Sequence, residues 1–310
     1  MRSLVVGTIR RLAIVPLLLS AFLVGCGGAE QAPDARTSVF AYDGSAPLRI
    51  EDAGRVNPGY PIAVRDVSFA APGGRISAFL AVPPGAGRKP AVVYVHGQGG
   101  DRSELLVPAT WLAARGAVAL ALTAPSAVAD RTQTGGLDGL RRDRDLAVAD
   151  VVAVRRALDL LAARPDVDAD RLGLVGYSAG ARTGAVLAGV EPRLDALVLM
   201  SAGASPVADY VDAAPTPLED DVEALLGEID PLRYVALRGD RVVLLQNGRQ
   251  DEVVPREALE EVVDATSGAE VRWYDAGHAL NDAAYREHLA WLTRELAITG
   301  PPVAGAQTGP

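Results

Sequence analysis

Short apolar segments alternate with longer helix-like segments through most of the chain, and this alternation restricts the fold more than any other feature. The apolar segments are short and rich in Val, Leu and Ala, as in strands that are buried on both faces of a sheet. They lie at residues 91–95, 117–122, 172–177, 196–200, 242–246 and 271–274. The predicted helices lie at residues 104–115, 142–164, 179–190, 256–266 and 281–298. Strands and helices in this order predict an α/β fold with a mostly parallel, doubly wound sheet.

A hairpin precedes the first of these units. Residues 62–69 alternate between apolar and polar side chains, and residues 76–82 form a second apolar segment. Between them, Pro72, Gly73 and Gly74 supply the residue types that make a tight turn. The sequence therefore predicts that an antiparallel hairpin opens the sheet.

One serine lies where a predicted strand passes directly into a predicted helix. Gly176, Tyr177, Ser178, Ala179 and Gly180 fit the pattern G-x-S-x-G. In this context the serine is held on a tight turn that exposes its hydroxyl, and the glycines allow the strand and the helix to approach each other. The start of the helix also offers free N–H groups where an oxyanion would form. Ser178 is the predicted nucleophile, with the Ala179 amide as one oxyanion donor.

A second glycine-rich turn follows the strand at residues 91–95. It reads His96, Gly97, Gln98, Gly99 and Gly100, and its place at the end of a strand could direct a backbone N–H towards Ser178. We assign the second oxyanion donor to the Gln98 amide, the alternative being an ordinary glycine turn. His96 is expected to hold this loop rather than to act as a base.

An acid and a base follow in the order that a serine, acid, histidine arrangement requires. Asp251 comes just after the strand at 242–246, and His278 follows the last strand. Asp251 would orient the imidazole and stabilise its protonated form, while His278 would take the Ser178 proton. Asp275 and Glu252 are the competing acids, and His288 is expected to be a packed helix residue. Activity is therefore expected to fall when acid protonates His278.

The N-terminus has the features of an export signal. Arg2, Arg10 and Arg11 precede an apolar run, residues 12–24, which is too short to span a bilayer comfortably. The run ends at Cys26, the one cysteine of the chain, in a context that resembles a bacterial lipobox. This resemblance implies cleavage before Cys26 and lipid attachment to it, and hence an exported protein anchored to a bacterial membrane. The alternative is a secreted protein with an unmodified cysteine.

Composition excludes several other functions. The formal net charge of −9 argues against general binding to nucleic acid, which requires a basic surface. A single cysteine allows no intramolecular disulfide and no cysteine-based metal site. No metal and no organic cofactor is expected. The expected organisation is a signal peptide at 1–25, a lipidated N-terminus and linker at 26–46, a catalytic domain at 47–299 and a flexible tail at 300–310.

Several stretches together resemble the α/β-hydrolase superfamily, and within it dienelactone-hydrolase-like and acetyl-xylan-esterase-like members. They are residues 91–97, 164–180 and 248–255 with the final Gly277 and His278, so the resemblance spans roughly residues 60 to 298. It implies an α/β-hydrolase fold and hydrolysis of a small-molecule ester. Dienelactone hydrolase proper has a cysteine nucleophile, whereas this chain has Ser178. The serine favours ordinary carboxylic esters.

Two functions other than that of a carboxylesterase are compatible with this fold, a peptidase and a non-catalytic binding protein. A peptidase of the prolyl-oligopeptidase type shares the catalytic domain but carries a large propeller ahead of it. Only about sixty-five residues separate Cys26 from the strand at 91–95, which is too short for a propeller. A non-catalytic binding lipoprotein would have no need for an intact triad.

Residues 207–232 hold eight acids and no basic residue, which suggests either an acidic cap that disfavours anionic substrates or a solvated helix and loop.

Overall fold

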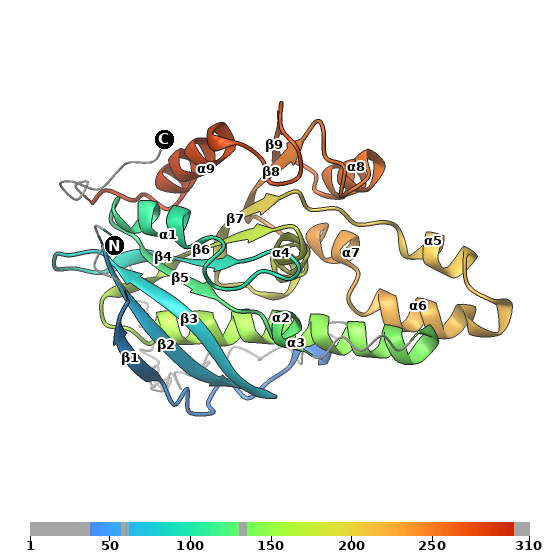
Figure 1. Cartoon of the computed structure of the whole chain (residues 1–310), viewed down its shortest axis with the longest axis horizontal. Helices are drawn as coiled ribbons and strands as arrows, with labels where there is room; N and C mark the ends of the chain where they lie inside the picture. Colours follow the sequence, from blue (N-terminus) through green and yellow to red (C-terminus); the bar gives the residue numbers. More distant parts are fainter. Residues whose placement is uncertain (1–37, 57–59, 61, 130–134, 301–310) are drawn as a thin grey trace, which may run out of the picture.

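The fold is an α/β-hydrolase fold built on one nine-stranded sheet, with helices on both faces (Figure 1). The computed structural model describes residues 38–56, 60, 62–129 and 135–300. Cys26 and the expected signal peptide lie outside these residues, as does nearly all of the expected tail. None of the helices in these ranges is long and apolar enough to cross a membrane.

The sheet has the order β1-β2-β3-β5-β4-β6-β7-β8-β9. Its strands are β1 (Glu51–Arg55), β2 (Ala63–Ala71), β3 (Gly74–Val82), β4 (Lys89–Val95), β5 (Val118–Leu122), β6 (Val167–Tyr177), β7 (Leu194–Met200), β8 (Val242–Gly248) and β9 (Glu270–Tyr274). From β5 to β9 all neighbours are parallel, whereas β1, β2 and β3 form an antiparallel edge that joins β5. The predicted parallel sheet and its opening hairpin are therefore confirmed.

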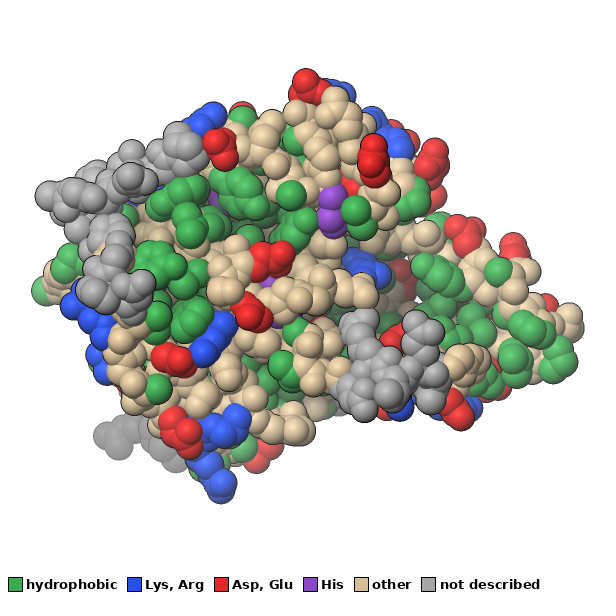
Figure 2. All heavy atoms as spheres, in the orientation of Figure 1, with side chains coloured by type: hydrophobic (Ala, Val, Ile, Leu, Met, Phe, Trp, Pro, Cys, Tyr) green, Lys and Arg blue, Asp and Glu red, His purple; other side chains and the backbone are tan. Residues whose placement is uncertain are grey.

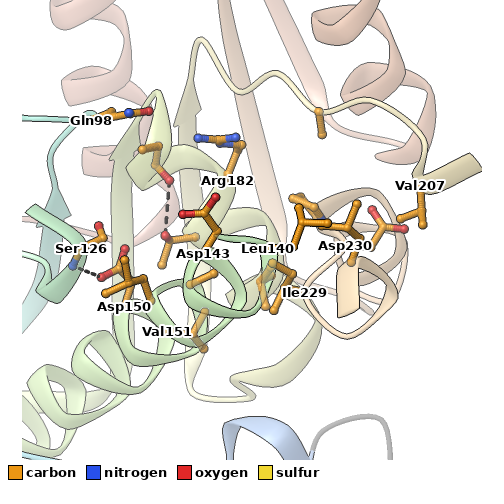
Figure 3. Close-up of a pocket in the computed structure, with 18 of the residues that line it drawn as sticks. Gln98, Ser126, Leu140, Asp143, Asp150, Val151, Arg182, Val207, Ile229 and Asp230 are labelled. Carbon is orange, nitrogen blue, oxygen red and sulfur yellow. Dashed lines mark hydrogen bonds between the residues drawn. The ribbon is translucent and has the colours of Figure 1, made fainter. Parts of the chain in front are cut away.

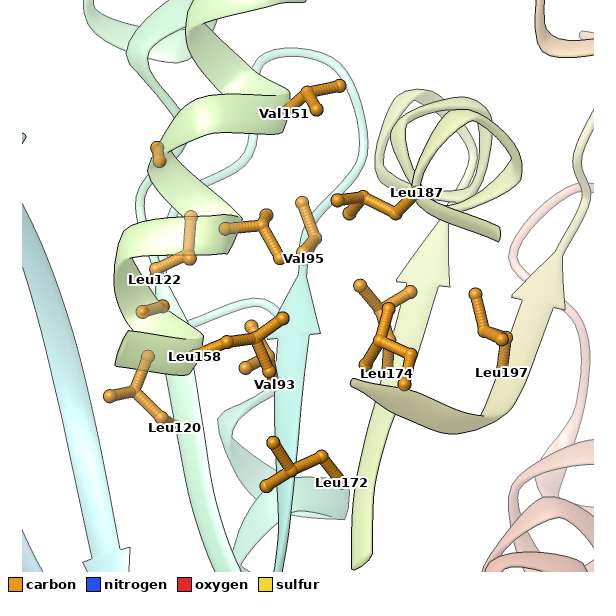
Figure 4. Packing of buried hydrophobic residues seen from close by; sticks show 14 of the residues in the cluster. Val93, Val95, Leu120, Leu122, Val151, Leu158, Leu172, Leu174, Leu187 and Leu197 are labelled. Carbon is orange, nitrogen blue, oxygen red and sulfur yellow. The ribbon is translucent and has the colours of Figure 1, made fainter. Parts of the chain in front are cut away.

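Helices cover the two faces in two groups. The first group is α1 (Leu106–Ala113) and α9 (Asp282–Glu295), and the second is α3 (Gly136–Ala162), α4 (Ala179–Val190) and α8 (Arg256–Ala265). Beneath α3 and α4, Val93, Val95, Leu120, Leu122, Leu172, Leu174 and Leu197 of the strands meet Val151, Leu158 and Leu187 of the helices (Figure 4). These side chains are buried because the parallel strands carry apolar residues on both faces.

Residues 207–232 form an arm that projects from the body, and we call them the cap segment (Figure 1). The arm contains α5 (Val207–Asp212), the 3-10 turn η2 (Thr216–Leu218), α6 (Glu219–Gly227) and the start of α7 (Pro231–Val235). A further short helix, α2 (Pro125–Val128), follows β5. Of the eight acids in the cap segment, seven are exposed or half-exposed on the arm, and only Asp230 lines the cavity described below. Most of these acids therefore fit the solvated helix and loop rather than an acidic cap that faces the substrate.

Strand β6 begins at Val167 rather than at residue 172, and three further differences from the predictions have a physical explanation. Helix α3 begins at Gly136 rather than at residue 142, although two glycines lie in its first turns, because packing against α6 compensates for their poor helix propensity. Strand β1 was not predicted, since it is short, polar and exposed at the sheet edge. Within the expected linker, the 3-10 turn η1 (Ser38–Phe40) buries Phe40 completely, so packed structure begins before residue 47.

Candidate active site

The candidate site lies where the strand order reverses. From β4 the chain moves to β5 on one side through α1, then crosses through α3 to β6 on the other side. The carboxyl ends of β4 and β6 therefore diverge into loops that leave a crevice, which is where open α/β sheets bind ligands. The two motifs singled out in the sequence, around Gln98 and Ser178, follow these two strands.

Ser178 stands between β6 and α4 in a strained backbone conformation. Its φ angle is 53° with ψ at −110°, a combination that few non-glycine residues adopt. Its amide donates to the Met200 carbonyl oxygen at 2.8 Å, so the end of β7 fixes the turn. A strained turn held in this way projects the hydroxyl above the sheet.

The two glycines of the motif are required by close backbone contacts. A Cβ atom on Gly180 would lie 2.3 Å from the Val95 carbonyl oxygen, and one on Gly176 would lie 2.3 Å from the Gly180 carbonyl oxygen. Both distances are far below van der Waals contact. The first turn of α4 can therefore pack against the end of β4 only when these two positions lack side chains.

Ser178, His278 and Asp251 are brought together from three strand ends. His278 Nε2 lies 2.9 Å from Ser178 Oγ, and His278 Nδ1 lies 2.8 Å from Asp251 Oδ2. An ionised carboxylate can only accept, so Nδ1 carries the proton and Nε2 accepts from the serine hydroxyl. The side chains are 15% exposed for His278 and 2% for Asp251, which leaves the imidazole accessible at one edge.

Asp251 is held as a carboxylate. Burial alone would raise its pKa, but hydrogen bonds from the Val254 amide, the His278 ring and the Val253 amide together lower the pKa below its ordinary value. Both amides donate to Oδ1 at 2.9 Å, which leaves Oδ2 for His278. The competing acids are elsewhere: Asp275 accepts from Gln250, and Glu252 is exposed.

Ser201 fixes the loop that carries His278. Ser201, which directly follows β7, is fully buried and has a φ angle of 51°. Its hydroxyl donates to the His278 carbonyl oxygen at 2.8 Å, and its amide donates to the Gln246 carbonyl oxygen at 2.8 Å. The sequence gives no sign of this contact, because a serine after a strand carries no motif.

The Gln98 loop is fixed by two side chains. The Ala124 amide donates to His96 Nε2 at 3.0 Å, so His96 is protonated on Nδ1 and donates from there to the Gly97 carbonyl oxygen at 2.6 Å. The Gly97 amide donates to Glu104 Oε2 at 2.7 Å. His96 thus has the structural contacts expected of it, whereas Glu104 was not singled out in the sequence.

Gln98 and Ala179 line one cavity, and Ala179 directly follows Ser178 in the chain. The cavity measures about 430 Å³ and is bounded by α3, α4 and the cap segment (Figure 3). As the first residue of α4, Ala179 has an amide with no carbonyl partner within the helix. The assignment of the Gln98 and Ala179 amides as oxyanion donors stays a prediction.

The third histidine of the chain, His288, is fully buried on α9. Burial lowers the pKa of His288 to about 3, and its Nδ1 lies 3.1 Å from Gln246 Oε1. Gln246 also donates to the Tyr274 hydroxyl, which donates in turn to Glu287. His288 is therefore a packed helix residue, as expected. Over the ranges that the structure describes, no group of three or more His, Cys, Asp or Glu side chains could hold a metal ion.

Comparison with known proteins agrees with this architecture. The fold matches that of an acetyl xylan esterase from Paenibacillus sp. R4 with a TM-score of 0.68 and 22% identity, covering 84% of this chain and 92% of that one. Acetyl xylan esterase 1 from Thermoanaerobacterium sp. JW/SL YS485 matches with a TM-score of 0.66, 21% identity and the same coverage. At these identities the likeness is one of fold.

A curated relative matches at higher identity over a shorter length. It is polyketide transferase af380 of Aspergillus fumigatus, 31% identical over 167 residues, which are 51% of this chain and 52% of that protein. The chain thus spans about half the length of this relative. Residues 76–290, which include Ser178, Asp251 and His278, match the dienelactone hydrolase family. The chain belongs to the dienelactone hydrolase family.

Proposed function

We propose that this protein is a serine hydrolase that cleaves carboxylic esters through an acyl-enzyme intermediate on Ser178. One observation carries the proposal, the continuous hydrogen-bonded series from Asp251 through His278 to Ser178. Its order and distances are those that a serine nucleophile, a general base and an orienting acid require. Membership of a hydrolase family supports the same class of reaction.

In the first half of the reaction, Ser178 Oγ attacks the ester carbonyl carbon while His278 Nε2 takes the hydroxyl proton. The amides of Gln98 and Ala179 donate hydrogen bonds to the carbonyl oxygen and stabilise the negative charge that develops on it. Asp251 stabilises the imidazolium, which then gives its proton to the departing alcohol. The alcohol leaves and the acyl group remains on Ser178.

In the second half, water replaces the alcohol. His278 takes a proton from the water as it attacks the acyl carbon, and the proton then returns to Ser178 Oγ as the acid is released. The buried Asp251 carboxylate keeps the imidazole oriented in both halves of the reaction.

A second outcome of the same chemistry is transfer of the acyl group to an alcohol. The name of the Aspergillus fumigatus relative, a polyketide transferase, favours testing it. Addition of small alcohols to an ester assay would distinguish the two, since a transferase would form a new ester at the expense of the free acid.

A fluorophosphonate probe tests the proposal directly, because it reacts with an activated serine. The wild-type protein should be labelled and Ser178→Ala should not, and the same variant should lose about 10⁴-fold or more in kcat. Absence of labelling on the folded wild-type protein would overturn the assignment.

The lipid anchor stays a proposal from the sequence. Cys26 lies outside the described residues, so attachment to a bacterial membrane through this cysteine rests on the lipobox-like context alone. Labelling with a palmitate analogue in cells, with Cys26→Ser as the control, would test it; equal labelling of both proteins would contradict it.

A further inference from the structure

The cavity that Ala179 lines is large compared with the smallest acyl groups. Its volume of about 430 Å³ falls within the range of about 300–1,000 Å³ typical of sites that bury a drug-sized ligand. Gln98 and Ala179 both line it, so an ester whose carbonyl oxygen reached their amides would have one of its substituents directed into the cavity.

The walls of this cavity are mainly apolar and come from three places. Helices α3 and α4 supply Val151 and Val186, and the turn η1 supplies Phe40. The cap segment supplies the opposite wall, through Val207, Leu226 and Ile229 (Figure 3). The cap segment therefore turns an apolar side to the cavity, while most of its acids are exposed to solvent.

Three of the polar side chains that line the cavity are held by hydrogen bonds within the protein. Asp150 Oδ1 accepts from the Ser126 amide, Thr183 Oγ1 donates to the Ala179 carbonyl oxygen, and Asp230 caps α7 by accepting from the Leu232 amide. Two charged lining residues, Asp143 and Arg182, are exposed. A substituent in the interior would therefore meet the apolar side chains of α3, α4 and the cap segment, beside three polar side chains that already have hydrogen bonds.

We propose that this cavity receives the larger substituent of the ester, and that the substituent is a mid-sized, mainly apolar group. The proposal rests on the proposed esterase function. It assigns to this protein esters with a medium-length aliphatic or an aromatic group, rather than acetyl esters of small alcohols alone. It also gives the cap segment a defined role as one wall of the substrate site.

Filling the cavity tests this assignment. Ala147 lines it from α3 and Val207 lines it from α5, so Ala147→Trp and Val207→Trp each place an indole in it from opposite sides. Ala208→Trp is the matched control, because Ala208 neighbours Val207, is exposed and does not line the cavity. Each protein would be assayed with p-nitrophenyl esters from acetate to decanoate, and with acetate esters of ethanol and of 2-phenylethanol.

We expect either filling variant to lower kcat/KM for bulky esters by about tenfold or more while changing that for the acetate of the smaller alcohol by less than about threefold. The acyl series and the alcohol series distinguish which side of the ester occupies the cavity. Unchanged selectivity in both folded filling variants would overturn the cavity assignment without touching the esterase proposal. Inactivity of the wild-type protein on every ester would instead contradict the esterase function.

Discussion

The loops around Ser178 and the cap segment border the same site, but they are held in opposite ways. The catalytic loops follow buried parallel strands and are fixed by hydrogen bonds from neighbouring strand ends, such as those of Ser201 and of the Ser178 amide. In the cap segment, by contrast, α5 buries no residue and α6 buries only Val222. Figure 2 shows apolar and acidic side chains side by side on this projecting arm.

This difference separates chemistry from selectivity. Catalytic groups must be held within a fraction of an ångström, which requires packed and hydrogen-bonded support. A wall that receives apolar groups has no such requirement, since apolar contact is not directional. Changes near the strand ends should therefore act on kcat for every substrate, and changes in the cap segment should act on the choice of substrate.

Replacing Asp251, the acid of the proposed triad, should give the largest effect of this comparison. In Asp251→Asn the side chain cannot stabilise the imidazolium and favours the wrong tautomer of His278, so kcat should fall by about 10³–10⁴ for short and long esters alike. Asp275→Asn is the matched control, because Asp275 is exposed and contacts Gln250 rather than His278. Steady-state kinetics on both variants would check this, and an equal loss in Asp275→Asn would contradict the assignment of Asp251.

Removing the Ser201 hydroxyl should have a smaller effect, but on the same kinetic constant. Ser201→Ala removes the donor to the His278 carbonyl oxygen, so the loop should position the imidazole less accurately and kcat should fall by about tenfold with little change in KM. Ser201→Gly also removes the hydroxyl but relieves the strained φ angle, which separates positioning from strain.

In both Ser201 variants, the second-order rate constant of fluorophosphonate labelling should fall in parallel with kcat. The fall should be seen at every pH at which the wild-type protein is labelled. A loss of thermal stability with unchanged labelling per folded molecule would instead show that Ser201 has only a structural role.

The buried hydrogen-bond network of His288 and Gln246 should make the stability of the protein depend on pH. His288 has a pKa of about 3 when folded, below its value in the unfolded chain, so the unfolded state binds a proton first as the pH falls. The stabilisation is complete above the unfolded pKa near 6.5 and is lost as the pH falls towards the folded value. Between pH 7 and pH 5 this single group should cost about 2 kcal/mol of unfolding free energy.

His288→Gln, which retains a partner for Gln246, should lack this part of the pH dependence in urea unfolding. Identical slopes of stability against pH in the two proteins would show that another group is responsible.

The sequence predicts the loops around Ser178 better than it predicts the cap segment, because the two regions are stabilised by different contacts. Ser178, Asp251 and His278 follow apolar strands, and the order of those strands along the chain could be read from the period of the pattern. Ser201 and Glu104 could not, because each acts through a contact with a backbone group that no motif pairs with it. Ser201 reaches His278, far along the chain, and Glu104 reaches back to the Gly97 amide in the neighbouring loop. The same holds for β1, whose residues are polar and which pairs with β2 through its backbone.

The cap segment was the least predictable region, since its acidic composition describes only its outer side. Exchanging the exposed acids Asp209, Asp212, Glu223 and Glu228 for amides should leave the ratio of kcat/KM between neutral and anionic esters within about twofold, because exposed charges are screened over about 8–10 Å at physiological ionic strength. Monoesters of glutaric acid and esters of pentanoic acid, both with p-nitrophenol, would measure it. A large gain for the anionic ester would mean that the outer charges of the cap reach the substrate, and that cap and catalytic loops are less separate than their packing indicates.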